Sequence, residues 1–274
     1  MIKLVADSSA NLHENTEMEV AYAPLKIVTA EKEYVDDANL DVPGMLKDLK
    51  EYKGKSGTAC PSVGDWLQTF GNAKEVLGVA ITSKLSGCWN AAQLAAKQYM
   101  EQFPNAKVCI LDTLTTGPEM QLLLEKCHTL IREGKLFDEI VASIKEYMQR
   151  THLLFSLESL NNFARNGRES PAVAKVAGIL GLRIVGSAKD GGLDPAHTCR
   201  GEKKALAQLF ASMKEMGYRG GKVRITHSYN LNMAETLKNM IRGEHPDSDI
   251  TIGLNRGLCC FYAEEGGLLV GFES

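Results

Sequence analysis

The chain has 274 residues and a formal net charge of −3, and 44% of its residues are hydrophobic while 24% are charged. This is ordinary globular composition, and its small net charge gives no general attraction to nucleic acid or to an anionic membrane. The apolar runs fall short of the roughly 18 residues of a bilayer span, and Asp7 interrupts the N-terminal one, so we expect a cytoplasmic protein without a secretory signal or stable membrane insertion.

Short apolar strands alternate with helical patterns up to about residue 150. The predicted strands are Ile2 to Ala6, Val76 to Ile81 and Val108 to Leu111. Helices are predicted to start at Ser62, where Asp65 completes a capping box, and around residues 89–103, 120–131 and 137–148. Strands that alternate with helices are typical of parallel sheets with crossover helices, so we predict an N-terminal α/β domain over residues 1–150.

The second half has a different pattern, with hairpins among the crossovers. Lys189-Asp190-Gly191-Gly192 is a turn signal that predicts a hairpin between residues 182–187 and 193–200. Further strands are predicted at 153–155, 223–226, 250–254 and 268–272, and helices at 160–168, 171–180, around 205–213 and at 233–241. We therefore predict a C-terminal α/β domain over residues 151–274 with a mixed or antiparallel sheet.

Two loops of the first half carry hydroxyl groups at predicted helix starts. Thr58 precedes Pro61 and Ser62, and Ser86 lies between a strand and a helix. Such a hydroxyl can donate to a small anion that is attracted by the free N–H groups of the helix, although a simple capping role is the commoner outcome. Neither loop has the glycine pattern of a phosphate-binding loop, so a carboxylate fits better.

The seven cysteines, at 60, 88, 109, 127, 199, 259 and 260, form neither a disulfide framework nor a zinc motif, and buried thiols are expected. A nucleophile at Cys60 or Cys88 is conceivable, because a helix N-terminus lowers the pKa of a thiol. No recognisable motif supplies an orienting partner for such a nucleophile. His227 follows a strand and could act as a base, but a structural histidine is the commoner outcome.

The chain resembles the DegV family of bacterial fatty-acid-binding proteins over nearly its whole length. The segments that carry the resemblance are Asp7-Ser8-Ser9, Thr58 to Ser62, Thr82 to Gly87, Asn166-Gly167-Arg168 and the hairpin that ends at Arg200. Leu85-Ser86-Gly87 with the preceding Ser83 is the most specific of them. The resemblance implies a two-domain α/β fold with a lipid tunnel between the domains.

In the family, a Thr and a Ser of two such loops bind the ligand carboxylate, and they match Thr58 and Ser86. Arg168 matches a family Arg near the carboxylate, although the charge of an Arg after a helix end also suits the helix dipole. The resemblance thus implies a ligand site at Thr58, Ser83, Ser86, Gly87, Arg168 and Tyr262, without catalytic residues, metal or cofactor. It implies a non-catalytic protein that binds a long-chain fatty acid and presents its carboxylate to a separate fatty acid kinase.

The sequence also departs from the family pattern beside this site. Ala59 and Cys60 replace Ser and Gln, Cys88 replaces Thr, and Tyr262 stands where the family has His. Tyrosine can donate a hydrogen bond but brings no positive charge at neutral pH. Glu264 and Glu265 follow and would repel an anion unless they point into solvent. A different amphiphilic ligand, or a thiol-dependent hydrolase or transferase, therefore stays open as an alternative.

Overall fold

The strands predicted at the start of the chain lie side by side in sheet A of a computed structural model, which describes residues 2–12, 18–169, 179 and 181–274. Across this parallel sheet the order is β2 (Val20–Ala23), β1 (Ile2–Asp7), β6 (Glu75–Ala80) and β7 (Lys107–Asp112). The predictions for β1, β6 and β7 are confirmed within one residue at each end. The four-residue strand β2 was not predicted, because so short a segment shows no period.

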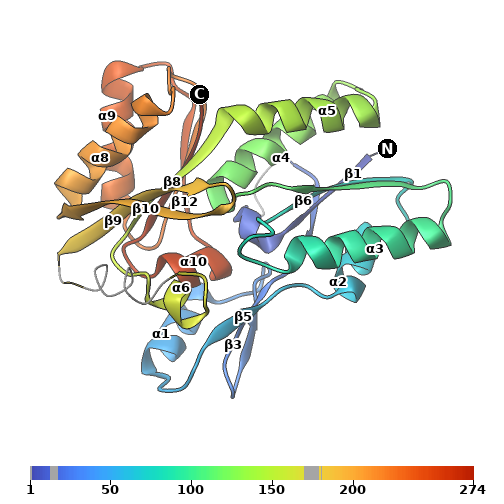
Figure 1. Cartoon of the computed structure of the whole chain (residues 1–274), viewed down its shortest axis with the longest axis horizontal. Coiled ribbons are helices and arrows are strands. Elements are labelled where there is room, and N and C mark those ends of the chain that lie inside the picture. The colour runs from blue at the N-terminus through green and yellow to red at the C-terminus, as the bar shows by residue number, and fades with distance from the viewer. Residues whose placement is uncertain (1, 13–17, 170–178, 180) are drawn as a thin grey trace.

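Four helices accompany this sheet, the first two before β6 and β7 and the last two after β7, as Figure 1 shows. They are α2 (Val63–Phe70), α3 (Cys88–Gln102), α4 (Gly117–Arg132) and α5 (Phe137–Tyr147). The predicted capping box is present, since Ser62 Oγ accepts from Asp65 N at 3.1 Å and Asp65 Oδ2 accepts from Ser62 N at 2.8 Å. Two short 3₁₀ helices, η1 (Ser8–Ala10) and η2 (Met148–Arg150), follow β1 and α5.

A small antiparallel sheet, sheet B, and one helix occupy a stretch for which the sequence predicted no element. The sheet has the order β4 (Glu33–Val35), β3 (Lys26–Val28) and β5 (Gly57–Ala59), and the helix is α1 (Val42–Glu51). Strands of three residues are too short for an alternating pattern to be visible. Sheet B is nevertheless important, because β5 carries Thr58.

Six strands of the second half form sheet C, which is mixed as predicted. Its order is β10 (Gly192–Arg200), β9 (Leu182–Lys189), β8 (Thr151–Leu157), β13 (Leu268–Glu273), β11 (Val223–His227) and β12 (Ile250–Leu254). Only β11 and β12 pair in parallel among these described strands. The predicted hairpin is confirmed: Asp190 and Gly191 at its turn have φ of 51° and 81°, the left-handed values of a two-residue type I′ turn.

Helices of the second half are α6 (Asn161–Arg165), α8 (Glu202–Glu215), α9 (Leu231–Glu244) and α10 (Gly257–Ala263). The first three were predicted, whereas the small and apolar segment of α10 was not. The helix predicted at 171–180 lies outside the described residues, except for residue 179. No helix among the described residues is long and apolar enough to cross a membrane.

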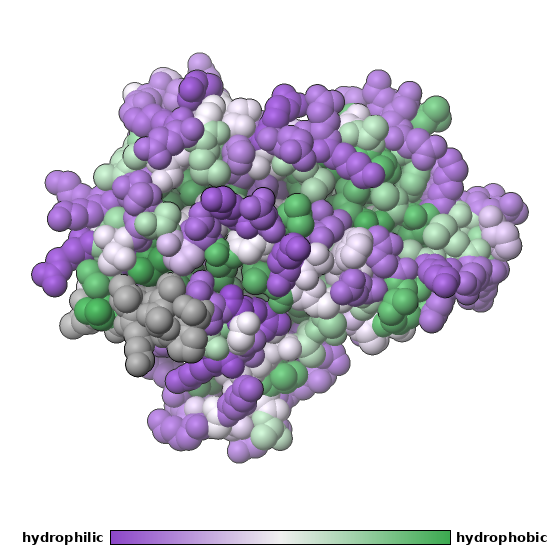
Figure 2. Space-filling view, viewed as in Figure 1, coloured by the Kyte–Doolittle hydropathy of each residue, from purple (hydrophilic) through white to green (hydrophobic). Residues whose placement is uncertain are grey.

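The two halves meet through α4 and α10. Helix α4 packs against β1 and β6 of sheet A and against β8, β11 and β13 of sheet C. Helix α10 reaches from the second half into the core of the first, where Leu258 and Phe261 join the cluster around Ile27 and Met45. All described strands before residue 150 belong to sheets A and B and all later ones to sheet C. The division into two domains near residue 150 stays a prediction. On the face shown in Figure 2, hydrophilic residues cover much of the outline and hydrophobic patches lie between them.

Glu119 is buried at the contact between α4 and sheet C. Its side chain is 6% exposed, and its Oε1 accepts a hydrogen bond from Thr151 Oγ1 at 2.8 Å. The backbone of α4 approaches β13 so closely here that a Cβ on Gly271 would lie 2.5 Å from Glu119 N. Burial in this contact raises the pKa of Glu119 from 4.5 to about 7.

The native protein should therefore lose stability as the pH rises through the range in which Glu119 is ionised in the unfolded chain but still protonated in the folded protein. Between about pH 4.5 and 7 the folded state keeps a proton that the unfolded state releases, so the free energy of unfolding falls with rising pH. As the pH rises from 4.5 to 8, the free energy of unfolding of Glu119→Gln should increase by about 3 kcal/mol relative to that of the unaltered protein. Urea unfolding of both proteins across this range measures the difference, and a difference that does not vary with pH would contradict the assignment.

Candidate functional site

A cavity of about 340 Å³ lies between one face of sheet C, helix α10 and the loops that follow β5 and β6. Its volume falls in the range of about 300–1,000 Å³ that is usual for small-molecule sites. The residues that line it are Leu25, Thr58, Ala59, Cys60, Ile81, Leu85, Ser86, Gly87, Thr116, Leu153, Phe155, Leu157, Phe163, Arg168, Leu193, Leu258, Cys259, Tyr262, Ala263 and Leu269. Both halves of the chain thus contribute to one site.

The wall on the side of sheet C is apolar. Leu153, Phe155 and Leu157 occupy alternate positions of β8 and therefore share one face of the sheet. Leu269 of β13 pairs with Phe155 and continues this surface, and Leu193 of β10 extends it. A hydrocarbon chain can be buried against this wall without leaving a polar group unpaired.

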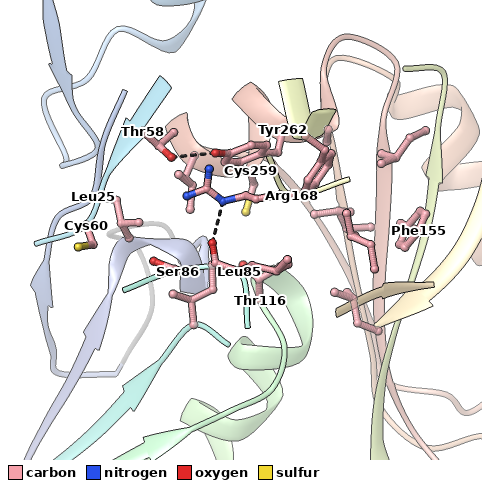
Figure 3. A pocket seen from close by; sticks show the side chains of 18 of the residues that line it. Leu25, Thr58, Cys60, Leu85, Ser86, Thr116, Phe155, Arg168, Cys259 and Tyr262 are labelled. Atoms are coloured by element: carbon pink, nitrogen blue, oxygen red, sulfur yellow. Dashed lines mark hydrogen bonds between the residues drawn. The ribbon is translucent and has the colours of Figure 1, made fainter. Parts of the chain in front are cut away.

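The opposite end of the cavity is polar, and four of the predicted residues meet there. Figure 3 shows Thr58, Ser86, Arg168 and Tyr262 converging from β5, the loop before α3, the loop after α6, and α10. Thr58 Oγ1 and Tyr262 OH are 2.8 Å apart and hydrogen-bonded. Arg168 is the only charged side chain in the described lining of this cavity. The site therefore offers hydroxyl groups and one positive charge at one end of an apolar space.

Aromatic contacts and the Arg168 charge hold Tyr262 in place. Its ring is 9% exposed and packs against Phe163 and Phe261 with centroid distances of 4.7 and 5.0 Å. The guanidinium carbon of Arg168 lies 5.3 Å from the centroid of the Tyr262 ring, which is within cation–π range. Burial raises the pKa of Tyr262, so its hydroxyl keeps its proton and can donate at neutral pH.

Ser86 and Gly87 line the cavity at the start of α3, whereas Ser83 does not. Ser86 Oγ accepts from Cys88 N at 3.2 Å, at the first residue of the helix, whereas the N-cap position itself is occupied by Gly87. Ser83 N instead donates to Asp112 Oδ1 at 3.0 Å and ties the loop to the end of β7. A ligand role for Ser83 thus remains a prediction that the cavity does not support.

The two glutamates after Tyr262 face away from the cavity. Glu264 Oε1 accepts hydrogen bonds from Ser159 Oγ at 2.8 Å and from Asn162 N at 3.2 Å, and Glu265 is exposed. Neither residue is part of the lining. The sequence analysis had expected these glutamates to repel an anion unless they point into solvent. Neither lies in the cavity, so they do not face an anion bound there.

The other chemical candidates have structural partners. His227 is buried outside the cavity, where its Nδ1 accepts from Asn230 N at 3.1 Å. The Cys88 thiol donates to Asp7 Oδ2 at 3.3 Å, and burial raises its pKa well above the ordinary value. Cys88 is therefore a thiol rather than a thiolate at neutral pH, which argues against a nucleophilic role. Cys60 is exposed and lines the cavity.

The sequence analysis did not identify most of the apolar residues that line the cavity. Alternating Leu153, Phe155 and Leu157 carried a detectable period of two, but the predicted strand ended at Phe155. Leu258 and Cys259 lie on α10, whose small apolar segment had no helix signal, and Leu25 precedes a three-residue strand. Nothing in a single sequence shows that these segments meet in space.

Comparisons with known proteins match this sequence and this fold. A family model described as an uncharacterised protein of the DegV family matches residues 1–273. A DegV domain-containing protein of Streptococcus pneumoniae is 38% identical over 99% of this chain and 98% of its own length. A DegV family protein of Eubacterium eligens, loaded with heptadecanoic acid, is 41% identical and covers 100% of both chains with a TM-score of 0.97. The fatty acid kinase B3 protein of S. pneumoniae, loaded with linoleic acid, is 38% identical over 100% of this chain and 99% of its own, also with a TM-score of 0.97.

The different surroundings of Cys60 and Cys88 predict a clear order of reactivity. In the folded protein at neutral pH, iodoacetamide should modify exposed Cys60 first and leave buried, protonated Cys88 unmodified. Peptide mass spectrometry after timed quenching measures this order, and alkylation in urea, where all seven thiols should react, is the control. Faster alkylation of Cys88 than of Cys60 would contradict the assignment and favour a thiol-dependent enzyme.

Proposed function

The chain belongs to the DegV family, and from that premise we propose that it binds a long-chain fatty acid in the cavity between its two α/β domains and presents the carboxylate to a separate fatty acid kinase. The observation that carries the proposal is the division of one cavity into an apolar wall and a polar end. Heptadecanoic and linoleic acid in two relatives of 41% and 38% identity support this ligand class.

Hydrophobic burial supplies most of the affinity in this proposal. Each methylene removed from water contributes about 0.8 kcal/mol, so about ten methylenes contribute about 8 kcal/mol before the costs of association. The wall of β8 and β13 is the surface that receives the chain. The polar end then fixes the orientation of the molecule more than it sets the total affinity.

The carboxylate would lie at the polar end, among Thr58, Ser86, Arg168 and Tyr262. The Ser86 hydroxyl and the Tyr262 hydroxyl would donate to its oxygens, with Thr58 donating to Tyr262 in the bond between them, and Arg168 balances its charge. Gly87 also lines this end, where a Cβ would make only an ordinary contact with Cys60 Sγ at 3.6 Å. No described group in this arrangement is placed to act as a nucleophile with a general base, so we propose a carrier that catalyses no reaction.

Delivery to a kinase is the step that makes such a carrier useful. The related S. pneumoniae protein bears the name of a fatty acid kinase B3 protein, which supports a kinase as the partner. In the proposed reaction the kinase transfers a phosphoryl group from ATP to the carboxylate held at the polar end. We propose that this exchange takes place in the cytoplasm.

Protein purified from bacteria should carry a fatty acid. Organic extraction followed by mass spectrometry identifies the co-purified molecule, and delipidated protein should take up palmitate at about a one-to-one ratio, since one such cavity is present in the described structure. A different amphiphile in the extract would favour the alternative ligand. Absence of any lipid together with no uptake would overturn the proposal.

Tyr262→Phe should weaken fatty acid binding by removing one donor to the carboxylate. A hydrogen bond to a charged group contributes about 1.5 kcal/mol or more, so the dissociation constant for palmitate should rise about tenfold. Binding of hexadecanol, which lacks the charge, should change less. Tyr229→Phe is the matched control, since Tyr229 is 46% exposed and lies outside the cavity. Equal effects of the two substitutions on palmitate would place the headgroup away from Tyr262.

A further inference from the structure

The turn of the β9–β10 hairpin reaches across from sheet C to the loop that carries Ser86. Figure 1 shows the hairpin extending from the second half towards the middle of the molecule. Thr82 Oγ1 donates to the carbonyl oxygen of Gly191 at 2.8 Å. Thr82 is 1% exposed and Gly191 is buried, so this bond between the halves is shielded from water.

The same hydroxyl also organises the loop that follows β6. Thr82 Oγ1 accepts from Lys84 N at 3.2 Å, and Thr82 O accepts from Leu85 N at 3.3 Å. These bonds shape the turn that leads into Leu85 and Ser86, both of which line the cavity. The position of the hairpin turn is thereby linked to the position of Ser86.

Gly191 fits this contact because it has no side chain. Its φ is +81°, and a Cβ would lie 2.6 Å from Thr82 Oγ1, 2.9 Å from Lys84 Cγ and 3.1 Å from Leu114 Cδ2. Two residues further along, Leu193 lines the cavity. The turn therefore sits between the loops after β6 and β7 while its strand forms part of the cavity wall.

We propose that this contact, the Thr82–Gly191 latch, positions the Ser86 loop and keeps the cavity closed over a bound fatty acid. The inference rests on the proposed function and adds the positioning residues Thr82 and Gly191, neither of which lines the cavity. A second bond to the same loop, from Arg168 Nε to Leu85 O at 2.7 Å, holds its other end. Opening the latch frees the hairpin and Ser86 together, which couples ligand release to loss of headgroup recognition.

Gly191→Ala tests the latch, with Gly201→Ala as the control for backbone strain. Gly201, at the far end of the same hairpin, has a similar φ of +79°, but a Cβ there meets nothing within 4 Å. Both substitutions force alanine to a positive φ, and the ψ of 164° at Gly201 puts that residue in a region almost restricted to glycine. The backbone strain at Gly201 is therefore at least as large, and an effect of strain alone should appear in Gly201→Ala as well. We expect Gly191→Ala to speed palmitate dissociation by about tenfold and to reduce the preference for palmitate over hexadecanol, while Gly201→Ala changes neither by more than about twofold.

Thr82 provides a second test that adds no bulk. Thr82→Val removes the hydroxyl at nearly constant volume and should act like Gly191→Ala, whereas Thr82→Ser keeps the hydroxyl and should restore slow release. Stopped-flow dissociation of palmitate and equilibrium titration with both ligands measure these effects. If Gly191→Ala and Thr82→Val release palmitate as slowly as Gly201→Ala, the latch is wrong and the proposed function stands. If the unaltered protein binds no palmitate, the proposed function fails and the latch fails with it.

Discussion

The cavity depends on the anchoring of α10 by one buried carboxylate. Asp36 is 2% exposed, and its two oxygens accept hydrogen bonds from Gly257 N and Leu258 N, each at 3.0 Å, at the free end of the helix. Burial raises the pKa of Asp36, while these backbone hydrogen bonds favour its charged form. Gly257 permits the approach, because a Cβ on it would lie 2.7 Å from Asp36 Oδ1.

Further bonds lock the same end of the helix to the first half of the chain. Arg256 N donates to Asn11 Oδ1 at 2.5 Å, and the Arg256 guanidinium donates to the carbonyl oxygen of Asp37. The seven-residue helix α10 is too short to be stable alone, so its position is set by these partners. It delivers Tyr262 to within hydrogen-bonding distance of Thr58, which is 204 residues earlier in the chain.

These long-range contacts explain what the sequence could and could not predict. Strands β1, β6 and β7, most helices and the β9–β10 hairpin follow from local apolar runs, capping and turn residues. Such signals are complete within about ten residues. Sheet B and α10 carry no such signal, because they are short and are stabilised by partners far away in the chain. Helix α1 does begin with a signal, the capping residue Asp41 followed by Pro43, which the sequence analysis overlooked. Thr58 and Ser86 were singled out by their place at predicted helix starts and by resemblance, and Arg168 and Tyr262 by resemblance alone. Their convergence required the fold. The roles of Asp36, Thr82 and Gly191 were not visible without it.

The hydrophobic residues of the chain form the cores and also line the cavity. Some of them close the two cores around α2, α3, α8 and α9, but the row Leu153, Phe155, Leu157 and Leu269 faces an unfilled space. An apolar wall without facing atoms gives up dispersion contacts, so this arrangement is less stable than a filled core would be. In the proposed function, an acyl chain in this cavity supplies the missing contacts and stabilises the native state by mass action. The same surface therefore accounts for ligand affinity and for a folded state that becomes complete when its ligand is bound.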